Sequence, residues 1–246
     1  MHTAHTFGYI SPASPGSGPQ PIHSIDTITA DPTLRNARIT IALSHLRIAS
    51  YPGKGIHHIL LHCFTQNWVA GKKEPVHFNT VYHVGKDEHT PIQGYPIFVG
   101  LSVASEGLAF KCRTINFKNE QDIAFLNSSE AGMSKSGLQL LNTAQSSITE
   151  ASSEAFALAK SIAMRYRNIA VQDFDLGLGF STNPIEGRLA EGSYLAVQLP
   201  EKYQQMWDWK EWVYSPSSGQ VMHRAPPQWI IPFNYLVLSI SRYSGT

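Results

Sequence analysis

Histidine and cysteine gather in one stretch of the chain, GIHHILLHCF, which runs from residue 55 to residue 64. Imidazole and thiolate groups are the ligands that zinc prefers in proteins. Because a strand has a period of two residues, His58 and His62 share one face, while His57 and Cys63 share the other. Histidines four residues apart on a strand stand about 13 Å from each other, too far to bind one ion at about 2 Å each. The stretch therefore predicts a histidine-rich strand, in which zinc would need ligands from a neighbouring strand.

Two aspartates, Asp173 and Asp175, alternate with apolar residues in VQDFDLG. Such a pair at the rim of a sheet offers oxygen ligands to calcium, which takes about six to eight of them. The pattern resembles the calcium-dependent membrane-targeting sandwich family, which gathers aspartates from two loops, and this resemblance implies a calcium site here. The second loop, GKDEHT, departs from that pattern because it offers only Asp87 and Glu88. The alternative interpretation is the solvated edge of a strand.

The candidate nucleophiles stand in settings that do not favour catalysis. Ser102 in GLSVA approaches the G-x-S-x-G motif, but that motif needs a sharp turn and a helix, and more strand follows Ser102. Cys112 has a lysine and an arginine beside it, which point to the opposite face of a strand. The glycine-bearing loops at 51–55 and 177–182 lack the GKS or GKT ending of a phosphate-binding loop. No nucleophile, base and orienting group come together, so catalytic residues are not assigned and an enzyme is the less favoured class.

Aromatic residues cluster between residues 203 and 229. Large rings supply much of the binding energy at protein–protein interfaces, and packing under a long loop is the alternative explanation. Few basic residues are interleaved with these rings, which disfavours single-stranded nucleic acid as a ligand. The candidate residues for protein contact are Trp207, Trp209, Trp212, Tyr214 and Trp229.

The composition narrows the classes of partner and compartment. Charged residues are 15% of the 246 residues, and the formal net charge is +1, so the chain lacks the basic footprint that nucleic-acid binding requires. No apolar run reaches the roughly 18 residues of a membrane-spanning helix, and the N-terminal residues lack the features of a secretory signal. The two cysteines, Cys63 and Cys112, suit free thiols in a reducing compartment. We therefore expect a soluble, cytoplasmic protein.

Strand-like runs separated by turn sequences must position these residues. The runs lie at 37–50, 56–69, 76–84, 95–104, 107–117, 169–180, 192–200, 209–216 and 229–243. Because a helix does not follow nearly every strand, the pattern predicts a mainly β fold: an antiparallel β-sandwich of about eight to nine strands. A helical block is inserted at about 119–168. Residues 1–35, rich in Pro, Ser and Gly, are expected to form a flexible arm before a single domain at 36–246.

These observations favour a non-enzymatic protein that acts through protein–protein contacts, as a subunit, adaptor or effector of a larger assembly. The partner would be another protein or a second copy of the chain, bound through residues 203–229 and the arm. One alternative is a membrane-associating sandwich, either calcium-dependent or a pore-forming, toxin-like effector that unfurls its helical block. A second alternative is a hydrolase with a site between the sandwich and the helices. The leading hypothesis needs no cofactor, and calcium or zinc belongs to the alternatives.

Overall fold

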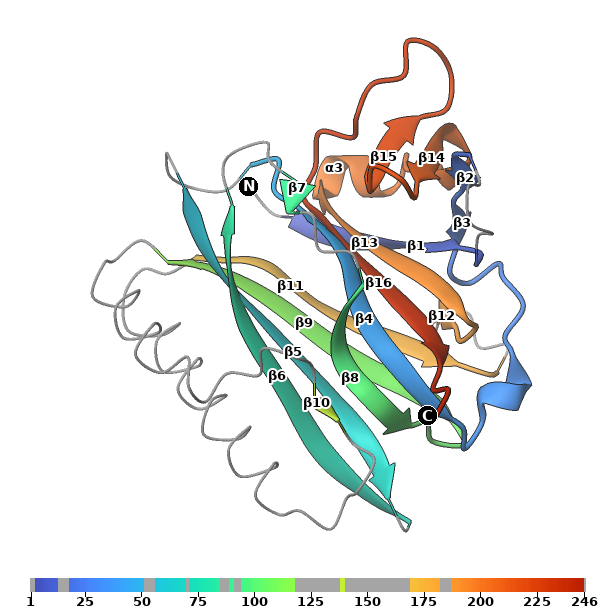
Figure 1. The fold of residues 1–246 in the computed structure, drawn as a ribbon. Coiled ribbons are helices and arrows are strands. Elements are labelled where there is room, and N and C mark those ends of the chain that lie inside the picture. The colour runs from blue at the N-terminus through green and yellow to red at the C-terminus, as the bar shows by residue number, and fades with distance from the viewer. Residues whose placement is uncertain are drawn as a thin grey trace.

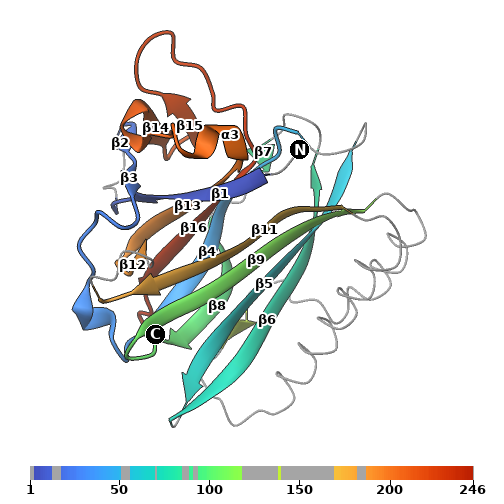
Figure 2. The same cartoon turned by 180° about the vertical axis from the view of Figure 1, so that it is seen from behind.

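The structure, a computed structural model, describes residues 3–12, 18–50, 56–69, 71–84, 89–90, 94–117, 138–139, 169–181 and 187–245. Over these residues the chain is mainly β, and its long strands pair antiparallel. The strands form two large sheets and one small sheet (Figures 1 and 2). The predicted mainly β, antiparallel fold is therefore confirmed. The predicted helical block at about 119–168 lies outside the described residues, except for one short strand.

The first sheet is the central one of the three. In spatial order it contains β10 (Leu138–Gln139), β8 (Tyr95–Ser102), β4 (Arg38–Arg47), β16 (Tyr235–Arg242), β13 (Gly192–Pro200), β1 (Thr3–Ile10) and β3 (His23–Ser24), and β7 (His89–Thr90) also pairs with β4. The expectation of a flexible arm needs correction for β1, because Thr3–Ile10 pairs with β13 along its whole length. The last three residues of β1 are buried, so this part of the N-terminal segment belongs to the folded core.

The second sheet follows the order β12 (Gly187–Arg188), β11 (Ile169–Gly179), β9 (Gly107–Phe117), β5 (His57–Val69) and β6 (Lys72–Val84). Its strands show the expected period of two: in β11, Phe174, Leu176 and Leu178 are buried, while the residues between them are exposed. The main hydrophobic core joins these side chains to others from the first sheet, such as Leu43 and Phe98. One face of the second sheet thus packs on the core, and we call the opposite face its outer face.

The third sheet is small and lies at one end of the molecule (Figure 1). It contains β15 (Gln220–His223), β14 (Trp212–Ser215) and β2 (Gln20–Pro21), and the neighbouring helices are α3 (Glu201–Gln204) and the 3-10 helix at Trp209–Glu211. A further 3-10 helix spans Pro32–Leu34. The predicted strand at 209–216 is therefore split, because Asp208 caps a helical turn by accepting a hydrogen bond from the Lys210 N–H at 2.9 Å.

A second hydrophobic core lies between the third sheet and the first. β13 contributes Leu195 and Val197 to this core, while Tyr194 and Ala196 of the same strand face the main core. Both faces of β13 are therefore covered, which explains why its sequence reads as a nearly continuous apolar run. We call residues 201–234, which follow β13 along the chain, the aromatic region.

Candidate functional site

A continuous series of ring contacts runs through the aromatic region. The buried Trp212 stacks on Trp207, with ring centres 5.0 Å apart and planes 10° from parallel. Trp212 also meets Trp229 edge-on at 4.9 Å. At the other end of the series, Trp207 and Tyr203 both contact Phe233, at 6.1 and 6.0 Å. Stacked and edge-on arrangements are the favoured geometries of aromatic pairs, so each ring fixes the orientation of the next.

Apolar side chains reach the surface at both ends of this series. The exposed fraction is 72% for Met206, 46% for Trp229, 38% for Tyr203 and 36% for Ile230. Several large apolar side chains exposed in one region are more informative than a single one. We call these four residues the apolar surface.

The five aromatic residues predicted for protein contact divide between this surface and the core. Trp229 is exposed and Trp207 is half-buried, whereas Trp209, Trp212 and Tyr214 are buried. The buried three belong to the second hydrophobic core. Contact of these five residues with a protein partner stays a prediction. Sequence reasoning missed Met206 and Ile230, although both lie next to the aromatic cluster along the chain.

Hydrogen bonds fix the aromatic region to the first sheet. The Tyr214 hydroxyl lies 2.7 Å from His45 Nδ1, and burial raises the pKa of Tyr214. The Tyr235 hydroxyl donates to the Gly219 carbonyl at 2.8 Å, and burial raises the pKa of Tyr235 to about 12. Gly219 has a φ of +67° and lies against His45, so that an added Cβ would stand 1.8 Å from the imidazole. The region is therefore held in one position by specific contacts.

The two aspartates predicted as calcium ligands lie on the outer face of the second sheet. Each stands opposite a cation of β9: Lys111 Nζ is 3.0 Å from Asp175 Oδ2, and Arg113 Nε is 2.9 Å from Asp173 Oδ2. Over the part of the chain that the structure describes, no group of three or more His, Cys, Asp or Glu side chains is arranged to hold a metal ion. Calcium at this pair stays a prediction, and each carboxylate already has a positive partner.

The histidine-rich strand is confirmed as β5, and one of its histidines has a partner on β6. His62 Nε2 lies 3.2 Å from His77 Nδ1, and the two ring planes are 16° from parallel. Burial lowers the pKa of His62 to about 4, with smaller contributions from His77 and Arg113, and burial also lowers the pKa of His77. Both rings are therefore neutral at pH 7, and one N–H joins them. This contact between neighbouring strands could not be read from spacing within β5.

The candidate nucleophiles occupy structural positions. Ser102 ends β8, and its N–H donates to Asn67 Oδ1 at 2.9 Å. Cys63 and Cys112 are buried register partners on β5 and β9, with their Sγ atoms 3.8 Å apart. Burial raises the pKa of Cys63 well above its usual range, which suppresses the reactive thiolate.

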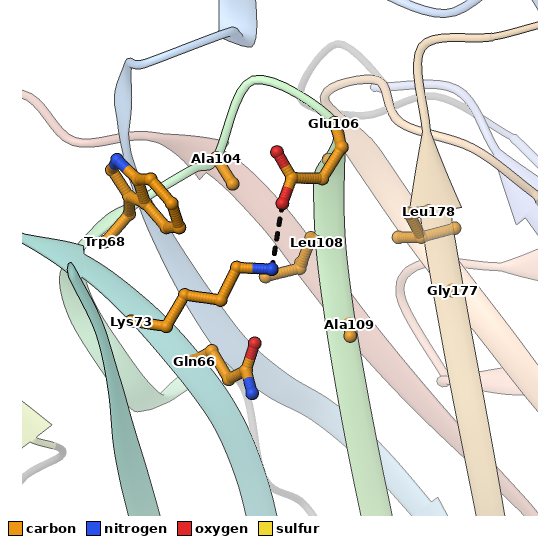
Figure 3. Close-up of a pocket in the computed structure, with 10 residues that line it drawn as sticks. Gln66, Trp68, Lys73, Ala104, Glu106, Leu108, Ala109, Gly177 and Leu178 are labelled. Atoms are coloured by element: carbon orange, nitrogen blue, oxygen red, sulfur yellow. Dashed lines mark ion pairs between the residues drawn. The ribbon is translucent and has the colours of Figure 1, made fainter. Parts of the chain in front are cut away.

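Two hollows lie on the outer face of the second sheet. One has a volume of about 380 Å³ and is lined by His62, Phe64, His77, Lys111, Cys112, Arg113 and Asp173. The other, which we call the small hollow, has a volume of about 160 Å³ and is shown in Figure 3. Side chains from β5, β6, β9 and β11 and from the loop before β9 meet in the small hollow. Neither hollow was predicted, since strands far apart in sequence build them.

An ion pair crosses the small hollow. Lys73 Nζ lies 2.9 Å from Glu106 Oε1 and 5.5 Å from the centre of the Trp68 ring (Figure 3). The hydrogen bond from Lys73, with others from the Glu106 backbone and from Ser105, lowers the pKa of Glu106 to about 2. Both charged side chains are about half exposed to solvent. The hollow thus holds a fixed pair of opposite charges beside an aromatic ring.

Within the described residues, no helix combines the length and the apolar character needed to cross a bilayer.

Comparisons with known proteins give no match to this chain. No protein-family model matches the chain, and neither the curated proteins nor the solved structures give a match.

Proposed function

We propose that this chain is a non-enzymatic β-sandwich protein that acts through protein–protein contacts, as a subunit, adaptor or effector of a larger assembly. The main core, to which both large sheets contribute side chains, supports the sandwich part of this proposal. The single observation that supports the function is the apolar surface: Tyr203, Met206, Trp229 and Ile230 are exposed, and Trp229 contacts the buried Trp212.

A rigid exposed side chain favours binding, because a partner that covers it loses little conformational entropy. A partner that covers a mobile apolar side chain must also immobilise it, at a cost of about 0.5–1.5 kcal/mol for each side chain. Trp229 is already held between Trp212 and His223, on which it stacks with ring centres 5.3 Å apart. Little conformational entropy is therefore lost when a partner covers Trp229. Nearly all of the free energy from removing its apolar area from water then contributes to binding.

The charges around the apolar surface indicate the chemistry of the partner. The nearby acidic residues Glu201 and Glu211 are matched by the basic residues Lys202 and Arg224, and all four are exposed. A balanced rim does not select a strongly charged partner. The partner surface is therefore apolar at its centre and close to neutral at its edge, as in a protein interface with an aromatic anchor.

Native mass spectrometry of the protein purified gently from its own cells tests this proposal. We expect the wild-type protein to appear in a complex of defined stoichiometry, and the double variant Met206→Ser/Trp229→Ser to lose at least about tenfold of the bound partner. Ile56→Ser is the matched control, because Ile56 is 67% exposed but lies outside the aromatic region. A wild-type protein that is always a bare monomer, or a double variant that keeps its partner, contradicts the proposal.

A further inference from the structure

We propose that the small hollow binds a neutral, hydroxylated six-membered ring, the size of one sugar unit. The inference is independent of the apolar surface, because it uses other residues on another sheet. Three features support it: the polar groups of the hollow, its apolar floor and its size.

The polar groups offer both donors and acceptors without a net charge. Lys73 supplies N–H donors, Glu106 supplies carboxylate acceptors, and the exposed Gln66 amide supplies one of each kind. The ammonium and the carboxylate form an ion pair at 2.9 Å, so together they carry no net charge. An anion or a cation would gain one partner and meet the like charge of the other. A ligand with neighbouring hydroxyl groups satisfies both, since a hydroxyl donates and accepts.

The floor of the hollow includes the small apolar residues Ala109 and Gly177. Figure 3 shows Ala109 on β9 and Gly177 on β11 to one side of the Lys73–Glu106 pair. A Cβ added to Gly177 would have no atom within 4 Å, and the backbone there does not adopt a positive φ. Neither strain nor crowding thus requires glycine at this place in a strand, where glycine often marks the close approach of a ligand.

The wall and the volume suit one ring. Trp68 is half-buried, so part of its indole faces the hollow and offers an apolar surface to C–H groups. The volume of about 160 Å³ is well below the range of about 300–1,000 Å³ that drug-sized ligands occupy. A single ring with an apolar face and hydroxyl groups at its edge therefore matches the hollow in size and in chemistry.

Fluorine NMR of the protein labelled with 5-fluorotryptophan tests this inference directly. The chain has five tryptophans, so the Trp68 signal can be assigned with Trp68→Phe, and the four signals from residues 207–229 serve as internal controls. The probes are D-glucose, D-galactose, D-mannose and N-acetyl-D-glucosamine, titrated into the millimolar range, with sodium phosphate as the charged comparison. We expect at least one sugar to shift the Trp68 signal alone, with a millimolar dissociation constant typical of a small ligand.

Gly177→Val is the decisive variant, because its side chain fills the floor and leaves every polar group in place. We expect it to weaken sugar binding by at least about tenfold, while the four control signals keep their positions. Gly18→Val is the matched control, since a Cβ at Gly18 also meets open space but lies outside the hollow. The proposal is overturned if no sugar shifts the Trp68 signal, if phosphate shifts it instead, or if Gly177→Val binds sugar like the wild type.

Discussion

The aromatic region and the outer face of the second sheet both present side chains to solvent, but they hold them in place differently. In the aromatic region, Trp229 is oriented by ring contacts with Trp212 and His223. On the outer face, Lys111 and Arg113 are oriented by ion pairs along two neighbouring strands. Rings that contact one another offer a large, rigid apolar area, whereas the paired charges of the outer face offer directed polar contacts. The first arrangement underlies the proposed protein contact, and polar contacts of the second kind underlie the proposed ligand site.

The largest effect is expected at the centre of the aromatic region. Trp212 is 4% exposed and contacts Trp207 and Trp229, so Trp212→Ala leaves a cavity and removes the support of the surface. We expect the free energy of unfolding, measured with urea, to fall by about 3–5 kcal/mol. Trp229→Ala, which removes a ring that is nearly half exposed, should cost less than half as much. Equal losses for the two variants would show that Trp229 is part of the core and not of a surface.

Two glycines of the small hollow provide a test on the outer face. Gly107 has a φ of +135°, and an added Cβ would stand 2.1 Å from the Leu178 carbonyl oxygen, whereas a Cβ at Gly177 meets open space. We expect Gly107→Ala to destabilise the protein by about 3 kcal/mol, because backbone atoms must move. Gly177→Ala should be neutral or stabilise it by up to about 1 kcal/mol. Urea unfolding of both variants checks this difference, and a large loss for Gly177→Ala would show that its floor is not empty.

The sequence predicts the strands of this chain better than it predicts their neighbours. In VQDFDLG the alternation of apolar and polar residues predicts β11, and the burial of Phe174 and Leu176 follows that alternation. The partners of Asp173 and Asp175 could not be predicted in this way. They lie on β9, 64 residues from Asp175 and 60 residues from Asp173 along the chain, and only the pairing of β9 with β11 brings them together.

The same limit applies to the N-terminal segment and to the aromatic region. In the N-terminal segment, the Pro-, Ser- and Gly-rich run that follows Ile10 led to the expectation of a flexible arm, although β1 precedes this run. In the aromatic region, Trp212 is buried and Trp229 is exposed. Burial there is decided by the contact with β13 and β16, which is a tertiary effect that the local pattern does not contain.

An intermediate effect is expected from acidification of the outer face. The pKa of His62 falls from its usual 6.5 to about 4 in the folded protein, chiefly because the ring is buried. Between these two values the unfolded chain binds more protons than the folded one, so stability falls as the pH is lowered from 6.5 to 4. We expect this group to contribute a loss on the order of 2–3 kcal/mol. His5, whose pKa burial also lowers to about 4, adds a loss of the same sign.

Urea unfolding at a series of pH values separates the contribution of His62 to the pH dependence of stability from that of His5. His62→Gln keeps a polar group beside His77 but removes the titration, so its stability should fall less steeply between pH 6.5 and 4 than that of the wild type. Above pH 7 the two pH dependences should run parallel, because neutral imidazole contributes no proton linkage there. Identical slopes over the acidic range would show that His62 titrates normally and is not buried in solution.

The smallest effect is expected at the ion pairs of Asp173 and Asp175. It tests whether these carboxylates bind a metal ion or only form ion pairs with their cationic neighbours. The Lys111 and Asp175 side chains are 59% and 68% exposed, and exposed pairs of this kind contribute about 0–1 kcal/mol. Asp175→Asn should therefore change the free energy of unfolding by less than about 0.5 kcal/mol in buffer with a chelator. Calcium binding at the pair would raise the stability of the wild type alone, as mass action requires. If the melting temperatures of wild type and Asp173→Asn/Asp175→Asn respond equally to calcium, the carboxylates serve only their cationic neighbours, and the calcium hypothesis for this pair is wrong.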